Sequence, residues 1–458
     1  AVADVLGRHE ALRTIYPDTP DGPYQKVVSV VGTVPDLTPI PTAESDVPAV
    51  LHEYFARGFD VTRKAPVRAM LLEVGTDEYV LAVVVHHIAA DGFSMRPFTR
   101  DLLIAYAARS TGENPAWFPL PVQYSDYALW QREVLGDESD PESVISAQLD
   151  YWTKALAGLP DQLDLPSDRP RPAVASSRGA DFAFHIDAET HRALGELALG
   201  QGASQFMVLH GVLAILLARL SGTPDIVVGT PIAGRGEQAL DDLIGMFVNT
   251  LVLRTEVTGA GTFSELLQQV RDTDLHAFAN AELPFERLVE VLNPPRSQAR
   301  HPLFQVSLAV QNLGQTNVTL PGLTVDNIDL AADIAKFDLQ WTVVETAPAG
   351  TESDGLDITV TYATELFDRA TVATFADRFV RILRAVVAHP GIAVGDIDLL
   401  DAGERAALVP VRGGSAGSSV LLADVLTRAM DSDAVAIRDA DRSLTYGELD
   451  AQSTQLAR

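Results

Sequence analysis

Residues 85–93, VHHIAADGF, are the stretch from which both the fold and the site of this chain are predicted. Two adjacent histidines, His86 and His87, are followed by Asp91, four positions after the second, and then by a glycine. Residues 79–85 are almost wholly apolar and rich in β-branched side chains, which predicts a strand. A strand that runs directly into imidazoles, a carboxylate and a glycine indicates either a polar corner of a core or a site of chemistry.

Three interpretations of this polar stretch stay open from the residues alone. The first is structural, with His86, His87 and Asp91 only pinning a loop at the end of a strand. The second is a metal site, because His87 and Asp91 have the spacing of two ligands on one helical turn. Gly92 argues against a helix there, and no third ligand stands nearby in the sequence. The third is catalytic, with one imidazole facing a reacting group while the carboxylate organises the site.

Length and composition narrow the class of protein. A chain of 458 residues predicts two or three domain-sized units, and 47% apolar with 21% charged residues is typical of soluble globular proteins. The longest apolar run, which begins at His210, is shorter than the roughly 18–20 residues of a membrane span and predicts a buried helix. The lack of cysteine excludes disulfides and thiolate sites and fits a cytoplasmic enzyme. A formal charge of −28 argues against nucleic acid as a partner.

The first part of the chain is predicted to contain a strand and several helices. Helices are expected over residues 94–109, with Ser94 near the N-cap, and over residues 143–159. Residues 165–180, rich in proline and serine, are typical of a linker between two lobes. Apolar residues with helical spacing begin at the first position without a cap, so the chain is expected to begin inside a helix.

The second part alternates helices with strands, which predicts an α/β fold. Thr262 and Glu265 predict a capping box at the start of one helix. DLQWTVVET and LDITVTYAT are expected to pair as two antiparallel strands. Asp368 is a candidate cap for a long helix that ends before Pro390.

Five motifs in order are similar to those of the condensation domains of nonribosomal peptide synthetases. The family's signature His-His-x-x-x-Asp-Gly is complete here as His86, His87, Asp91 and Gly92. The other four are RHEALRT (8–14), YSDYALW (124–130), IGMFVNTLVLR (244–254) and RHPLFQVSLAVQN (300–312).

The resemblance covers nearly all of residues 1–405 and implies a fold. It implies two chloramphenicol-acetyltransferase-like α/β lobes in a V-shaped arrangement with a tunnel between them. The expected N-terminal lobe is 1–164, the linker 165–180 and the C-terminal lobe 181–405. The family's first motif would lie upstream of the first residue, so the N-terminal lobe is expected to be incomplete, and whether the chain is active by itself stays open.

The end of the chain resembles a second family. Residues 444–449, LTYGEL, are similar to an early motif of adenylation domains. The Gly/Ser-rich residues 406–420 are expected to be a linker, and 421–458 the beginning of an adenylation domain, with nothing left to bind ATP.

The resemblance also implies a reaction and partners. An upstream donor and a downstream acceptor peptidyl carrier protein would bring substrates on 4'-phosphopantetheine arms, and an acyl group would pass from a thioester to an α-amine. No cofactor or metal bound directly to the chain is implied, and the chain is expected to act as a monomer within a larger synthetase. The alternatives are a free-standing acyltransferase that uses coenzyme A and a non-catalytic carrier-docking domain.

Roles for the signature residues follow from the resemblance. His87 would take a proton or orient the amine, and the main-chain N–H near Gly92 would contact the reacting group. His86 would be structural. Asp91 would form a buried ion pair with Arg235, which closes the stretch PIAGR.

Further residues are expected in supporting roles. Asn312 matches a polar residue that lines the family's tunnel, and its alternative role is to form a turn at the end of a strand. Trp130 and Trp152 are expected in the core. Five other motif residues are interpreted mainly as scaffold: Arg13, Tyr124, Asp126, Asn249 and Arg254.

Overall fold

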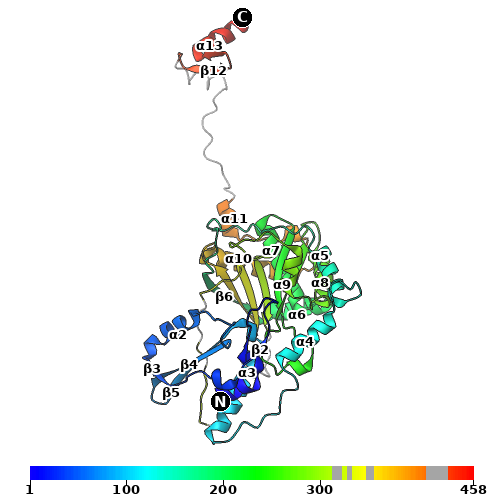
Figure 1. Ribbon diagram of the computed structural model, residues 1–458. Coiled ribbons are helices and arrows are strands. Elements are labelled where there is room, and N and C mark those ends of the chain that lie inside the picture. The colour runs from blue at the N-terminus through cyan, green and yellow to red at the C-terminus, as the bar shows by residue number, and fades with distance from the viewer. Residues whose placement is uncertain (312–321, 327, 329–332, 347–354, 409–431) are drawn as a thin grey trace. The chain divides into compact units, whose positions relative to one another are not determined.

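The computed structural model describes residues 1–311, 322–326, 328, 333–346, 355–408 and 432–458. The chain divides into two compact units, Ala1–Leu399 and Leu400–Arg458, which are described separately (Figure 1). The predicted tunnel residue Asn312 lies outside the described residues, as do positions 409–420 of the predicted linker and 421–431 after it.

A small sheet with a helical layer on each face forms the N-terminal part of the first unit. Strand order is β3-β4-β5, with β3 and β4 parallel and β4 and β5 antiparallel. Val83 and Val85 of β5 pack with α1 and α3, whereas Val80 and Ala82 pack with α2, because alternate side chains of a strand point to opposite faces. The elements are α1 (Val2–Arg8), β1 (Thr14–Ile15), β2 (Lys26–Val27), β3 (Ile40–Pro41), α2 (Val47–Ala56), β4 (Val67–Gly75), β5 (Glu78–Val85) and α3 (Met95–Ser110).

A six-stranded mixed sheet forms the larger lobe of the first unit. Its strand order is β6-β11-β10-β9-β7-β8, in which β9 pairs in parallel with both β10 and β7 and the other pairs are antiparallel. The strands are β6 (Gly179–Asp187), β7 (Asp225–Ile232), β8 (Asn249–Glu256), β9 (Val306–Gln311), β10 (Leu339–Thr346) and β11 (Gly355–Ala363). The helices are α6 (Ala188–Gly200), α7 (Gln205–Ser221), α8 (Phe263–Ala279), α9 (Phe285–Leu292) and α10 (Arg369–Ala388).

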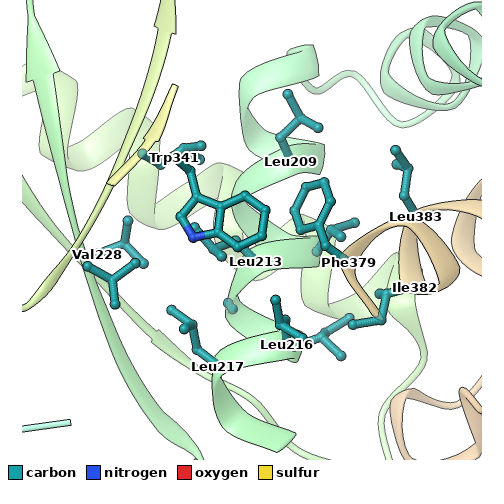
Figure 2. Close-up of a cluster of buried hydrophobic side chains, with 14 of the residues drawn as sticks. Leu209, Leu213, Leu216, Leu217, Val228, Trp341, Phe379, Ile382 and Leu383 are labelled. Carbon is teal, nitrogen blue, oxygen red and sulfur yellow. The ribbon is translucent and has the colours of Figure 1, made fainter. Parts of the chain in front are cut away.

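Helix α7 lies at the centre of the main core. Its residues 207–217 are all buried, as expected of a helix that is apolar on every side. Figure 2 shows Trp341 of β10 and Phe379 of α10 beside Leu213 of α7, with the two aromatic ring centroids 4.9 Å apart. The apolar run that begins at His210 is therefore a buried helix, as predicted. No single helix in the described part of the chain is long and apolar enough to cross a membrane, and only α6 with α7, across a bend of 104°, reaches that length and composition together.

Several local predictions in this lobe are confirmed. The Thr262 Oγ accepts the N–H of Glu265, and Glu265 Oε2 accepts the N–H of Thr262 at 2.8 Å, which is the expected capping box. Strands β10 and β11 pair antiparallel in register. Helix α10 starts directly after Asp368, but the carboxylate of Asp368 makes no capping bond and instead lies 2.5 Å from Arg169.

Helices α4 (Tyr124–Leu135) and α5 (Val144–Ala155) connect the small sheet with the six-stranded sheet. Trp152 of α5 is buried, and its indole N–H donates to the carbonyl of Asn280 at 2.8 Å. Trp130 of α4 is 45% exposed, so its prediction as a core residue is wrong. The reason is that α4 packs through Tyr124 and Tyr127 of its first turn against Phe247, and Trp130 lies one turn beyond.

The predicted lobe boundaries at residues 164, 180 and 405 stay predictions. Helix α5 falls within the predicted N-terminal lobe but packs on the six-stranded sheet, since Arg254 of β8 donates to the carbonyl of Ala155.

The second unit contains a strand pair and two helices in its described residues. These are α11 (Ala402–Leu408), β12 (Val435–Asp439), β13 (Arg442–Thr445) and α13 (Tyr446–Leu456). The Thr445 hydroxyl accepts the N–H of Glu448, and Glu448 accepts the N–H of Thr445 at 2.9 Å. The stretch LTYGEL is thus the end of a strand followed by a capping box.

Candidate active site

His86 holds the start of the polar turn that follows β5. Its backbone N–H donates to the carbonyl of Pro66 at 2.8 Å, and its Nδ1 accepts the N–H of Ile88 at 3.0 Å. That second bond caps the short 3-10 helix η4 (His87–Ala89). The ring of Phe59 meets the imidazole edge-on, with centroids 5.7 Å apart. A capping bond together with an aromatic contact is typical of a side chain that fixes a loop.

His87 and Gly92 lie on the solvent side of the same turn. His87 is exposed, and within the described residues its imidazole has no hydrogen bond to another side chain or to the backbone. Gly92 is exposed too, and a methyl group at its Cα would meet no atom within 4 Å. The turn therefore presents a free imidazole and an uncrowded stretch of backbone outward.

Asp91 faces the opposite way, into the protein. Its side chain is fully buried and accepts hydrogen bonds at both carboxylate oxygens. Oδ1 accepts the N–H and the hydroxyl of Ser94, both at 2.8 Å, and Oδ2 accepts the N–H of Phe247 at 3.0 Å. Oδ1 also lies 3.2 Å from Nη2 of Arg235. Because its side chain is buried and both oxygens are bonded to the protein, Asp91 anchors the turn.

Arg235 comes from the loop after β7, which meets the turn that bears Asp91. Its guanidinium donates to the carbonyl of Leu243 at 3.0 Å and lies 4.1 Å from the centre of the Phe247 ring. The loop approaches residue 247 so closely that a Cβ on Gly234 would lie 1.9 Å from the carbonyl oxygen of Phe247, and Gly234 has φ +63°. Only glycine fits this backbone position, which is what aims Arg235 at Asp91.

Ser94 is the site residue that the sequence analysis missed. It occupies the N-cap position of α3, as predicted, but its hydroxyl makes no capping bond to that helix. Instead, the Oγ lies 2.9 Å from the carbonyl oxygen and 3.1 Å from the amide nitrogen of Gly245, in the loop between β7 and β8. The only sequence signal was a serine three positions after Asp91, and that pattern equally suits an ordinary helix cap.

Three basic side chains bond to the carboxylate of Asp101 on α3, the helix that follows this turn. Asp101 of α3 accepts from Nε2 of His9 at 2.9 Å, from Arg8 at 2.7 Å and from Arg100 at 2.8 Å. Burial alone would raise the pKa of the Asp101 carboxyl, but the bonds from His9 and Arg100 outweigh it and lower that pKa to about 2. Burial lowers the pKa of His9, although Asp101 acts in the opposite sense. Arg100 also forms an ion pair with Asp242, which lies in the segment before Gly245.

The residues that were interpreted as scaffold make structural contacts. The Tyr124 hydroxyl donates to the carbonyl of Met246 at 2.8 Å, and burial raises its pKa, so it stays protonated. The others bond to nearby backbone or pair with a carboxylate: Arg13 to Leu6, Asp126 to Gln123, Asn249 to Ala281 and Leu283, and Arg254 to Asp225.

The metal interpretation finds no support in this geometry. Within the described ranges, no three side chains of the His, Asp and Glu types gather as ligands of one ion would. Asp91 is buried and bonded to protein donors whereas His87 is exposed, so the two do not form a shared ligand pair.

Comparison with known protein families gives one clear match, to the condensation domain, over residues 1–409. Over 462 residues the chain is 47% identical to a probable nonribosomal peptide synthetase of Salinispora arenicola, and over 463 residues 43% identical to a dimodular nonribosomal peptide synthase of Bacillus subtilis. In both cases all of this chain is covered, but only 6% and 19% of the relatives. The chain therefore spans less than a fifth of these proteins.

Solved structures share the fold. The X-domain from teicoplanin biosynthesis is 36% identical with a TM-score of 0.81, covering 87% of this chain and 88% of that one. A four-domain nonribosomal peptide synthetase bound to AMP and glycine is 21% identical with a TM-score of 0.75, covering 99% of this chain and 35% of that one. The first condensation domain of the calcium-dependent antibiotic synthetase, in complex with a substrate analogue, is 20% identical with a TM-score of 0.66, covering 87% and 89%. The predicted α/β class with two chloramphenicol-acetyltransferase-like lobes is confirmed.

Proposed function

We propose a catalytic role for His87 on the premise that this chain belongs to the condensation domain family, whose relatives are nonribosomal peptide synthetases. The chain is accordingly an amide-bond-forming enzyme domain of the acyltransferase type, and its reaction is peptide-bond formation. Neither alternative, the coenzyme A-dependent acyltransferase or the non-catalytic docking domain, is favoured by these relatives.

The proposal rests on the different environments of Asp91 and His87, which lie on one turn. Asp91 is buried and bonded on both oxygens, whereas His87, four residues earlier, presents a free imidazole to solvent. An anchored carboxylate and a free imidazole on the same short turn suit a side chain that must meet an incoming group in a fixed place.

The substrates are proposed from the family's chemistry. An acyl group passes from the thioester of an upstream donor carrier to the α-amine on a downstream acceptor carrier, both held on 4'-phosphopantetheine arms. The C–N bond forms, the C–S bond of the thioester breaks, and the donor arm is left as a thiol. An α-amine has a pKa of about 7.7–8.0, so a sizeable fraction is nucleophilic at neutral pH. Alignment of two tethered substrates can then supply much of the rate as effective molarity.

Within that reaction each residue of the turn has a proposed task. His87 takes the proton that the amine loses as the C–N bond forms, or orients the amine for attack. The backbone N–H at Gly92 contacts the reacting carbonyl, for which the open space beside it leaves room. His86, Asp91 and Arg235 hold the turn and do not touch substrate. The role of Asn312 as a tunnel residue stays a prediction.

Residues 421–458, whose described part belongs to the second unit, are proposed to be the beginning of an adenylation domain. The support is the LTYGEL stretch, with its strand end and capping box, and relatives that match the whole length of this chain. The adjoining adenylation domain and the two carriers are thus the proposed partners, within a larger synthetase in which this chain acts as a monomer. The cytoplasmic location stays a prediction.

A transfer assay with the full chain tests the function. Donor and acceptor carriers loaded from a panel of the common amino acids are mixed with the chain, and carrier-bound dipeptide is detected by mass spectrometry. Product that requires both loaded carriers and the chain is expected. Transfer from an acyl-coenzyme A to a free amine, with no transfer between carriers, would overturn the proposal in favour of the coenzyme A enzyme, and carrier binding without any transfer would favour the docking domain.

A further inference from the structure

The hydroxyl of Ser94, like Asp91 Oδ1, bonds both to the turn bearing His87 and to the loop between β7 and β8, and it alone of the two can both donate and accept. Ser94 is fully buried. Its Oγ lies 2.8 Å from Asp91 Oδ1 and 3.2 Å from the Asp91 amide nitrogen, both on its own turn. It also lies 3.1 Å from Nη2 of Arg235 and within 3.1 Å of both the amide nitrogen and the carbonyl oxygen of Gly245.

This environment uses the whole bonding capacity of a hydroxyl. A hydroxyl offers one hydrogen and two lone pairs. Two acceptors, Asp91 Oδ1 and the Gly245 carbonyl, lie within reach of the hydrogen, and three donors, the amides of Asp91 and Gly245 and the Arg235 guanidinium, lie within reach of the lone pairs. A serine that only capped α3 would need none of these contacts and would instead accept an N–H of the first turn of the helix, a bond that Ser94 does not make.

The Ser94 hydroxyl also bonds to the backbone of the larger lobe, at Gly245. Gly245 is buried, and a Cβ on it would lie 2.3 Å from the ring of Tyr124, so its backbone lies directly against a side chain of α4. Its N–H donates to Ser94. Asp91 reaches this loop two residues later, at the N–H of Phe247. The turn is thus bonded to the loop at two points, at Gly245 through Ser94 and at Phe247 through Asp91.

We propose that Ser94 is a positioning residue that fixes the turn carrying His87 and Gly92 at a set distance from the loop 240–248. The inference deepens the proposed function and rests on it, because the distance matters only if substrates must meet at His87. Asp91 and Arg235 supply most of the attraction through charge, whereas the directional bonds of Ser94 set the register of the contact.

The lack of cysteine in the sequence allows a direct measurement of that distance. The exposed His52 of α2 and Gln268 of α8 are replaced by cysteine and spin-labelled, and the label distance is measured by pulsed electron paramagnetic resonance. The variant Ser94→Ala is expected to broaden or shift the distance distribution relative to the labelled parent. In unlabelled protein, measured well below its melting temperature, it is expected to lower kcat for transfer at least ten-fold with little change in KM.

The matched control is Ser143→Ala. Ser143 is also a buried N-cap serine, at α5, where its hydroxyl accepts the N–H of Ser146 and donates to the carbonyl of Asp137. Its loss should lower the melting temperature but leave the distance distribution and the kcat of folded protein unchanged. If Ser94→Ala behaves in the same way, Ser94 is only structural and the inference is overturned.

Two further outcomes separate this inference from its premise. If Ser94→Ala does not fold, Ser94→Thr, which keeps the hydroxyl, is expected to fold and to transfer, and failure of both variants to fold would overturn the positioning role. If the parent chain transfers nothing, the proposed function fails. The label distances then decide alone whether Ser94 sets the contact between the lobes.

Discussion

Asp91 and Arg235 stand 144 positions apart in the chain, and their side chains form an ion pair of 3.2 Å inside the protein. The carboxylate is fully buried and the guanidinium only 7% exposed. One partner belongs to the turn after β5 and the other to the loop after β7, so the pair joins the turn that bears His87 to the larger lobe. Its effect on stability comes from burial, because each charge depends on the other for compensation.

Removal of either partner should destabilise the fold strongly. We expect Asp91→Ala and Arg235→Ala each to lower the free energy of unfolding by about 3–5 kcal/mol, because the remaining charge stays buried without its partner. Urea denaturation followed by circular dichroism measures this. The control is Arg287→Ala, whose partner Glu138 and own side chain are both more than a third exposed. That variant should lose much less stability, because its ion pairs with Glu138 and Glu290 are exposed to solvent, and equal losses at Arg235 and Arg287 would contradict the buried-pair argument.

Loss of the exposed imidazole should affect activity and not stability. We expect His87→Ala to lower the transfer rate by about 10²–10⁴-fold, the usual range for a group that moves a proton in the transition state. The melting temperature should not change, because the side chain is exposed and unbonded in the described structure. The same assay on His52→Ala, an exposed histidine on α2, should give the parent's rate. A His87→Ala rate near that of the parent would remove His87 from the reaction.

Two glycines of the site should respond oppositely to the same methyl group. Gly92→Ala should leave the unfolding free energy unchanged, because the added Cβ meets nothing within 4 Å, and it should slow transfer if the substrate approaches the backbone there. Gly234→Ala should destabilise the fold by at least about 1–3 kcal/mol, since its φ is +63° and the Cβ would collide with the Phe247 carbonyl. Denaturation and transfer measurements on both variants check this. A normal rate for Gly92→Ala would show that the glycine serves no substrate.

Stability should fall on mild acidification because one buried and one half-buried histidine, His9 and His301, have lowered pKa values. Burial lowers the pKa of His9 and of His301, so the unfolded chain binds protons near pH 6.5 that the folded chain does not. The free energy of unfolding is at its full value above about pH 6.5. It decreases as the pH falls below that value, by at most about 1.4 kcal/mol per pH unit for each histidine. The carboxyl of Asp101, with a pKa of about 2, adds its own loss only between about pH 4 and pH 2.

Urea denaturation at pH 7.5 and pH 5.8 measures this dependence. In the parent the unfolding free energy should be lower at pH 5.8. In His9→Gln, which cannot titrate, the difference between the two pH values should be smaller. An unchanged difference would show that His9 is not neutral in the folded protein.

The sequence by itself determined the features that depend on neighbouring residues. The strand at 78–85, the capping box of Thr262 and Glu265 and the buried course of α7 all rest on patterns a few residues long, because their hydrogen bonds and apolar faces repeat within one or two turns. The signature His86, His87, Asp91 and Gly92 also lies on one turn, and for that reason it could be recognised directly.

Only the tertiary structure decided where side chains point once two distant segments meet. Ser94 sits where a helix cap was predicted, but its hydroxyl bonds to Gly245 of the distant loop and makes no capping bond to the helix. Trp130 was expected in the core from its helical spacing, and it is exposed because α4 makes its contacts through its first turn. In both cases the deciding partner is more than a hundred positions away, and a contact at that separation depends on the packing of the lobes and not on any local pattern.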